Sequence, residues 1–198
     1  MSAEPALLTV HLADDAATAR FGEDLLLAPE IGDCVALEGD LGAGKSTLSR
    51  ALIRALADDP ELEVPSPTFT LVQNYDLRIS VAHFDLYRLS DASELDELGL
   101  EEALAEGICL VEWPAKAGRA LPKDRIEISF QFASDGGRNL SIQAPELKLA
   151  RLRRIIEIRR FLEENGYAGA RRRHLTGDAS NRAYEHVYPA DGAARLVL

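Results

Sequence analysis

One short stretch constrains the fold of this chain more than any other part of its sequence. Residues 39–47 read GDLGAGKST and match G-x-x-x-x-G-K-[ST], the pattern of a phosphate-binding loop. The apolar run at residues 34–37 is typical of a buried strand, and residues 48–56 repeat apolar side chains at helical spacing. A strand, a glycine-rich loop and a helix in this order predict an α/β fold, because such a loop binds phosphate at the positive end of a helix.

The residue types within the loop indicate how it would hold phosphate. Gly39, Gly42 and Gly44 allow backbone angles that side chains forbid, so the loop amides can converge on phosphate oxygens. Lys45 would pair with the β- and γ-phosphates, and the Ser46 hydroxyl would ligate Mg²⁺. The alternative is an ordinary glycine-rich turn before a helix. The strand-like run before the loop and the helical pattern after it argue against this alternative.

The length of 198 residues leaves room for one α/β domain of ordinary size and a small additional part. No apolar run approaches the roughly 18 residues of a membrane-spanning helix, and the first residues lack the basic and apolar regions of a signal peptide. We therefore expect a cytoplasmic protein. Cys34 and Cys109 lie inside apolar runs without metal-ligand spacing, so we expect small buried side chains.

The net charge of −11 is unevenly spread. Residues 1–147 are strongly acidic, whereas residues 148–198 carry a net positive charge, which predicts a phosphate-loop domain followed by a different, basic part. The acidic part argues against independent tight binding to nucleic acid, since phosphate contacts need Lys and Arg, but it allows a protein partner that carries RNA. The arginines at 171–173 could form a nucleic-acid patch, and a solvated charge run is the simpler interpretation.

The pattern of apolar residues and turn signals predicts a mostly parallel sheet flanked by helices, with an antiparallel β-edge at its C-terminal end. The edge is a hairpin around the turn at residues 135–137. Asp14 is a candidate N-cap for the first helix. The predicted helices are residues 14–27, 48–57, 90–104 and 147–164, and the predicted strands are residues 7–12, 34–37, 70–75, 79–84, 107–111, 125–132 and 138–144.

Two carboxylates, Asp85 and Glu112, each follow an apolar strand. A magnesium-ligating or water-orienting acid occupies this place in phosphate-loop enzymes, and both could face one crevice at the carboxyl ends of the strands. For either acid alone, a solvated loop charge is an equal alternative. Thr68 lies in a proline-containing stretch that could sense nucleotide or could be a solvated turn. His83 lies inside a strand and is expected to be a core histidine rather than a ligand.

Taken together, four motifs resemble one known family. They are the phosphate loop, SPTFTLV at residues 66–72, HFDLYRL at residues 83–89 and CLVEWP at residues 109–114. In this order they resemble the TsaE (YjeE) family, the ATPase component of bacterial tRNA threonylcarbamoyladenosine synthesis. The resemblance implies a weak, Mg²⁺-dependent ATPase that supports modification of tRNA position 37 together with the TsaB and TsaD proteins.

The resemblance also assigns roles to residues. It implies Lys45, Thr68, Asp85 and Glu112 as catalytic residues, and Ser46 and Glu112 as ligands of Mg²⁺. Ser46 stands where the family more often has Thr, and both hydroxyls can ligate the metal. The residues implied to bind ATP are Gly39, Asp40, Leu41, Gly42, Ala43, Gly44, Lys45, Ser46, Thr47, Trp113 and Arg138.

The last part of the chain departs from that family. Residues 175–184 resemble the opening of an aminoglycoside-phosphotransferase-like kinase lobe, which implies a fusion of which this sequence is the front. The division expected is therefore a TsaE-like domain at 1–147, followed by a basic helix and the start of a truncated lobe at 148–198. We expect residues 166–198 to be loosely ordered or packed on a neighbour, since a truncated lobe exposes strand edges.

Two other functions share the phosphate loop. A small-metabolite kinase would need an arginine-rich lid for its acceptor, and residues 1–147 contain no basic cluster to supply one. A nucleotide-gated adaptor without catalysis would bind ATP but would not need the set of Lys45, Ser46, Asp85 and Glu112. An ATPase that drives a partner through a cycle accounts for this set directly.

Overall fold

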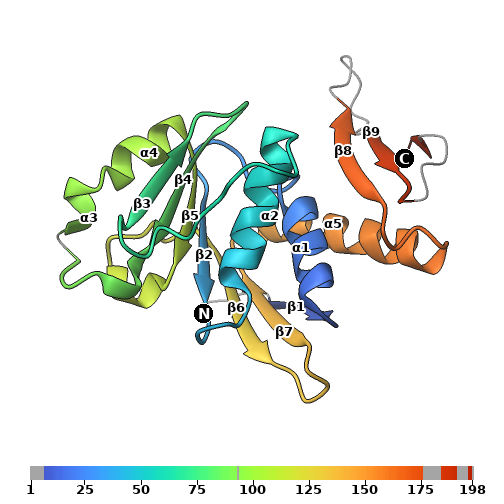
Figure 1. Cartoon of the computed structure of the whole chain (residues 1–198), viewed down its shortest axis with the longest axis horizontal. Coiled ribbons are helices and arrows are strands. Elements are labelled where there is room, and N and C mark those ends of the chain that lie inside the picture. Colours follow the sequence, from blue (N-terminus) through green and yellow to red (C-terminus); the bar gives the residue numbers. More distant parts are fainter. Residues whose placement is uncertain (1–6, 93, 176–183, 191–195, 198) are drawn as a thin grey trace.

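A seven-stranded sheet forms the centre of the molecule (Figure 1). The computed structural model describes residues 7–92, 94–175, 184–190 and 196–197. Its helices are α1 (Asp15–Leu25), α2 (Lys45–Ala57), α3 (Glu94–Glu97), α4 (Leu100–Glu106) and α5 (Glu146–Glu164). The strands are β1 (Leu7–Leu12), β2 (Cys34–Glu38), β3 (Val72–Tyr75), β4 (Ser80–Asp85), β5 (Gly107–Glu112), β6 (Ile126–Phe132), β7 (Arg138–Gln143), β8 (Arg171–Leu175), β9 (Tyr184–Tyr188) and β10 (Leu196–Val197).

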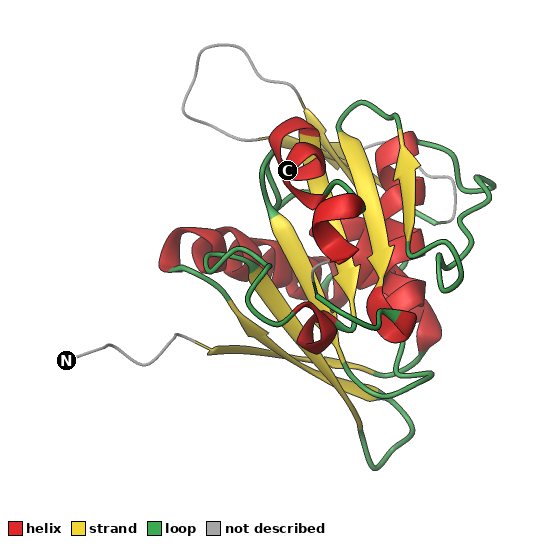
Figure 2. Cartoon of the chain, turned by 90° about the vertical axis from the view of Figure 1, so that its left-hand side faces the viewer, coloured by secondary structure: helices red, strands yellow, loops and turns green. Residues whose placement is uncertain are grey.

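The strand order of this sheet is β1-β7-β6-β2-β5-β4-β3. The four central strands β6, β2, β5 and β4 are parallel, while β7 and β1 continue the sheet in antiparallel fashion on one side. Figure 2 shows these strands as one twisted sheet. The predicted mostly parallel sheet with an antiparallel C-terminal β-edge is therefore confirmed. The opposite edge is also antiparallel, because β3 pairs with β4 through a short turn, a pairing that the sequence pattern did not reveal.

Helices cover both faces of the sheet (Figure 1). On one face α1, α2 and α5 bury a core that includes Leu25, Leu52 and Leu152. On the other face α3 and α4 cover a second core with Leu95 and Leu100. The side chain of Asp14 caps α1 by accepting a hydrogen bond from the Ala17 amide at 2.6 Å, as its position before an apolar periodic segment predicted.

The prediction of one continuous helix over residues 90–104 is wrong. The structure has two short helices instead, α3 and α4, with Gly99 between them at a φ of 73°. This left-handed conformation cannot continue a right-handed helix, and glycine adopts it without steric cost. The apolar residues of both pieces still face the same core, which explains why the periodicity appeared continuous.

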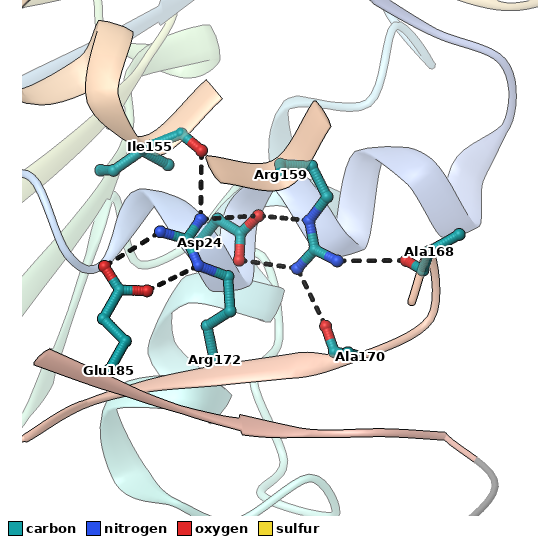
Figure 3. A network of polar contacts seen from close by, with 7 residues as sticks. All are labelled: Asp24, Ile155, Arg159, Ala168, Ala170, Arg172 and Glu185. Carbon is teal, nitrogen blue, oxygen red and sulfur yellow. Dashed lines mark hydrogen bonds and ion pairs between the residues drawn. The ribbon is translucent and has the colours of Figure 1, made fainter. Parts of the chain in front are cut away.

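The described part of the tail contains regular secondary structure, and the loose order or packing on a neighbour expected for residues 166–198 stays a prediction. Strands β8, β9 and β10 form a second, antiparallel sheet beside α5. Arg172 on β8 is buried, so the arginine run is not simply solvated. Its guanidinium bonds to Glu185 and to the Ile155 carbonyl, and it forms an ion pair with Asp24 of α1 (Figure 3). Most of the stretch that resembles a kinase lobe, residues 176–183, lies outside the described residues.

Within the described ranges, no helix is both long enough and apolar enough to cross a lipid bilayer.

Candidate nucleotide-binding site

The phosphate-binding pattern lies between the end of β2 and the start of α2. Gly39, Gly42 and Gly44 have φ angles of 147°, 78° and 110°, a region that side chains disfavour. At Gly39 the requirement is also steric, because an added β-carbon would lie 2.9 Å from the β-carbon of Phe130. Gly44 directly precedes the first turn of α2. The loop therefore ends at a helix N-terminus, whose unpaired amides favour an anion.

The ammonium group of Lys45 folds back onto its own loop. Nζ donates hydrogen bonds to the carbonyl oxygens of Gly39 at 2.7 Å and Asp40 at 2.9 Å. It also lies 3.9 Å from the centre of the Trp113 ring, a cation–π distance. Burial lowers the pKa of Lys45, while the charge of Glu112 acts in the opposite direction. A buried cation whose hydrogen bonds reach only neutral carbonyls is suited to pair with an anion that enters the loop.

Strands β4 and β5 bring the two acidic residues to the same edge of the sheet. Their parallel register pairs Asp85 directly with Glu112, and these residues are 3% and 2% exposed. In open α/β sheets, ligands bind in the crevice outside the carboxyl ends of parallel strands. Both carboxylates therefore lie at the edge where the phosphate loop begins, and neither is a solvated loop charge.

Glu112 contacts the first turn of α2. Its Oε2 accepts a hydrogen bond from the Ser46 hydroxyl at 2.9 Å, and its Oε1 accepts one from the Ser49 hydroxyl at 3.5 Å. Hydroxyl and carboxylate oxygens are the ligand types that Mg²⁺ prefers, and Mg²⁺ usually takes only one or two protein ligands beside phosphate and water. Ser46 and Glu112 therefore fit the chemistry of a magnesium site that a bound nucleotide would complete.

Asp85 holds the loop that precedes β3. Its Oδ2 accepts hydrogen bonds from the hydroxyls of Ser66 at 2.8 Å and Thr68 at 2.7 Å, and its Oδ1 accepts one from the Tyr87 amide at 3.1 Å. The two hydroxyls lie 3.0 Å apart. Thr68 thus reaches the site through Asp85, beside Glu112, rather than standing in a solvated turn. Any movement of this loop would have to break or carry these bonds, which gives the loop a defined link to the acidic edge of the sheet.

Arg138 and Trp113 approach the phosphate loop from different elements. Nε of Arg138, on β7, donates to the carbonyl of Ala43 within the loop at 3.1 Å, and Nη2 bonds to Asp15 at 3.0 Å. Trp113 follows β5 with a positive φ of 60° and packs against Tyr87 with ring centres 5.1 Å apart. The structure therefore brings both side chains next to the loop. The Arg138 guanidinium contacts the backbone carbonyl of Ala43, and the Trp113 ring contacts the ammonium group of Lys45.

His83 is the neighbour of the site that sequence reasoning missed. Its side chain is buried as expected, but Nε2 lies 2.9 Å from Oε1 of Glu112. Nδ1 has no hydrogen-bond partner within the described part of the chain. Its spacing could have indicated this position. Residues two apart on a strand lie on the same face of the sheet, and His83 lies two residues before Asp85. Ser49 was missed as well, although it lies three residues after Ser46 and so on the same helical face.

A parallel sheet centre, a glycine-rich loop that opens a helix and two acidic strand ends define a phosphate-loop nucleotide-binding protein. Comparison with known proteins makes the assignment narrower. The family model described as "Threonylcarbamoyl adenosine biosynthesis protein TsaE" matches residues 12–140, and the chain belongs to this TsaE family.

Relatives and a solved structure agree with this assignment. The chain is 37% identical over 144 residues to the tRNA threonylcarbamoyladenosine biosynthesis protein TsaE of Haemophilus influenzae, covering 69% of this chain and 89% of that protein. It is 34% identical over 126 residues to the protein of the same name from Treponema pallidum, covering 63% and 92%. The crystal structure of YdiB from Bacillus subtilis superposes with a TM-score of 0.64 at 27% identity, covering 82% of this chain and 99% of that one.

The family match contains every candidate site residue from Gly39 to Arg138 and ends before α5. The second sheet and the helix that leads to it therefore lie outside the matched region. Whether residues 1–147 and 148–198 act as separate domains stays a prediction.

Proposed function

We propose that this chain is a Mg²⁺-dependent ATPase of the cytoplasm that supports threonylcarbamoyl modification of adenosine at position 37 of tRNA. The hydrogen bond between the Ser46 hydroxyl and Glu112 carries the proposal, because it joins the phosphate loop to an acidic strand end. A phosphate loop without a carboxylate at this place could bind nucleotide, but it would lack the oxygen set that Mg²⁺ needs for phosphoryl transfer.

The proposal gives roles to the phosphate loop and to the side chains at the ends of β4 and β5. The amides of residues 42–47 and the Lys45 ammonium would bind the phosphate oxygens, with Lys45 leaving the carbonyls of Gly39 and Asp40. Ser46 and Glu112 would hold Mg²⁺, which neutralises charge on the phosphates when bound. Asp85 would orient Thr68, whose hydroxyl would position the attacking water. His83 would fix the orientation of the Glu112 carboxylate through its hydrogen bond.

We further propose that TsaB and TsaD are the partners of this ATPase. The support is the name shared by the relatives, which places them in tRNA threonylcarbamoyladenosine biosynthesis. A group supplied in trans by such a partner can raise turnover by about 10³ to 10⁵-fold.

The test is ATP turnover by the isolated chain and by the chain with TsaB, TsaD and tRNA. We expect low turnover alone, stimulation by the partners, and loss of the stimulated rate in Glu112→Ala and Glu112→Gln. Glu106→Ala is a matched control, since Glu106 is an exposed carboxylate just before β5. Because the sequence has a single tryptophan, and Lys45 lies over its ring, tryptophan fluorescence reports nucleotide binding independently of turnover.

The outcomes distinguish the three functions that share this loop. Stimulated turnover that depends on Glu112 and not on Glu106 supports the partner-driven ATPase. Transfer of labelled phosphate to a small acceptor would instead identify a kinase. A fluorescence change on adding ATP, without turnover in any mixture, would identify a nucleotide-gated adaptor.

A further inference from the structure

A second basic site lies on the far side of α2 from the sheet. It is a cleft of about 770 Å³ between α1, α2 and the start of the second sheet, and we call it the arginine cleft. The arginines that line it are Arg50, Arg54, Arg78, Arg171, Arg172 and Arg173. They form a basic concentration on a chain whose net charge is −11, so chance placement of surface charge is a poor explanation.

The six arginines are not equivalent. The guanidinium of Arg172 is buried and already hydrogen-bonded to Glu185 and to the Ile155 carbonyl. Arg173 forms an ion pair with Asp58 at 2.7 Å. These two residues hold the second sheet in place and close one wall of the cleft. The other four remain available to a ligand.

Arg50 and Arg54 are pre-positioned for an anion. Nε of Arg50 donates to the Val64 carbonyl at 3.2 Å, and Nε of Arg54 donates to the Leu62 carbonyl at 2.9 Å. Within the described residues, the Nη groups of both have no hydrogen bond or ion pair. One bond therefore fixes each guanidinium while its outer edge stays free, and this edge is the one that binds phosphate in a bidentate manner.

The spacing of these groups suits more than one phosphate. Arg50 and Arg54 are four residues apart on α2, so their side chains are neighbours on one helix face with β-carbons about 5–6 Å apart. Arg78 and Arg171 are exposed, line the same cleft, and make no hydrogen bond or ion pair in the described ranges. Four cationic groups from three segments of the chain converge on a single concave space.

The walls of the cleft favour a small ligand over a nucleic acid. The volume lies within the range of small-molecule sites, and Leu26, Ala51 and Tyr188 supply apolar and aromatic surface. Glu23 and Asp59 also line the cleft, and their charges would repel an extended polyanion. A compact anion avoids that repulsion, since it lies within reach of the four arginines.

We propose that the arginine cleft binds a small molecule that carries two or more phosphate groups, at a site separate from the phosphate loop. Thr47 belongs to both sites, because it lies in the loop sequence and lines the cleft. The ligand would therefore contact the helix whose first turn meets Glu112. The site needs only the arginines and does not depend on the ATPase activity proposed above.

The test is a calorimetric titration of the full chain with inorganic pyrophosphate. We expect two sites per chain, one in the phosphate loop and one in the cleft. Arg50→Gln with Arg54→Gln removes charge-assisted bonds, each worth about 1.5–3 kcal/mol or at least tenfold in affinity, so the cleft site should weaken at least tenfold. Lys45→Ala should weaken only the other site.

Two further double variants keep the test decisive. Arg78→Gln with Arg171→Gln alters exposed residues without hydrogen bonds, and should weaken the cleft site even if the first pair disturbs folding. Arg119→Gln with Arg160→Gln removes the same charge from exposed positions outside the cleft, and should leave both sites intact. Circular dichroism confirms folding of each variant.

Several results would overturn the proposal. One is a single pyrophosphate site that Lys45→Ala abolishes. Another is two sites whose affinities are the same in the cleft variants and in the control. A third is binding of single-stranded RNA that requires Arg50 and Arg54 while pyrophosphate binds only the phosphate loop, since this would assign the cleft to nucleic acid.

Discussion

Replacing Asp24 with asparagine should destabilise the protein through the network that joins the second sheet to α1 (Figure 3). The Asp24 side chain is 1% exposed and accepts hydrogen bonds from Nε and Nη2 of Arg159 at 2.6 and 2.8 Å. It also forms an ion pair with Nη1 of Arg172 at 3.4 Å. Asp24→Asn keeps the shape of the side chain, but removes its charge and replaces one acceptor with a donor that faces two guanidinium groups.

The magnitude follows from what the substitution leaves behind. Arg172 would keep Glu185 as its carboxylate partner, but Arg159 would keep only the carbonyls of Ala168 and Ala170. Removing one partner of a buried ion pair costs about 3–5 kcal/mol, because the remaining charge is desolvated without compensation. For a domain of this size each kcal/mol lowers Tm by about 2–4 °C, so we expect a decrease of roughly 6–20 °C.

The measurement is thermal and urea unfolding followed by circular dichroism, together with hydrogen exchange on the native protein. Exchange should rise first in β8 and β9, since these strands are joined to α1 through Arg172. Glu127→Gln is the control, because the pair of Glu127 with Arg125 is partly exposed and worth about 0–1 kcal/mol. An Asp24→Asn protein within 1 kcal/mol of the wild type, with unchanged exchange in β8, would refute the role given to this network.

Three further predictions concern the candidate site and the core of the sheet. Burial raises the pKa of both Cys34 and Cys109 to about 12 from 9.0, so the native thiols should react with a disulfide reagent at pH 8 about a thousandfold more slowly than the unfolded chain. Gly39→Ala should cost more than Gly42→Ala in chemical unfolding, because both positions have a positive φ that costs a side chain about 1–2 kcal/mol, and at Gly39 the added β-carbon would also lie 2.9 Å from a β6 side chain, which adds about 1–3 kcal/mol of overpacking. Since burial lowers the pKa of Lys45 and bound phosphate would favour its charged form, nucleotide affinity should be constant near neutral pH and should fall as the pH rises through that lowered pKa, which fluorescence titration at alkaline pH would detect.

Local sequence pattern was sufficient to predict most of the fold and the position of the loop. The strand before residue 39, the glycine loop and α2 were predicted because each has its own signal within about 20 residues. The hairpin of β6 and β7 was predicted from the alternation of apolar and polar residues and from the turn signal at residues 135–137. Asp85 and Glu112 were placed at one edge because strand ends in parallel sheets converge, and the register confirms that placement.

Features that depend on distant partners could not be predicted from such signals. Arg172 carries no local sign of burial, because the carboxylates that pair with it come from α1 and β9. His83 looked like an ordinary core residue, because only the structure shows that its Nε2 lies 2.9 Å from Oε1 of Glu112 on the neighbouring strand β5. Gly99 lies inside a helical apolar pattern, and only its φ shows that it separates two helices. In each case the missing information is the position of a segment far along the chain or a backbone angle.

Helix α2 joins the two sites, because its residues serve both through different faces. Ser46 and Ser49 turn toward Glu112, while Arg50 and Arg54 turn toward the arginine cleft. A ligand in the cleft can change nucleotide affinity only if it binds one position of α2 more tightly than another. The size of the change is limited by that difference in the ligand's affinity. Such coupling is reciprocal, so ATP would change the affinity of the cleft for pyrophosphate by the same factor as pyrophosphate in the cleft changes the affinity for ATP. Thr47 follows Ser46 in the phosphate-loop pattern and also lines the cleft, so such coupling would act through the first turn of α2.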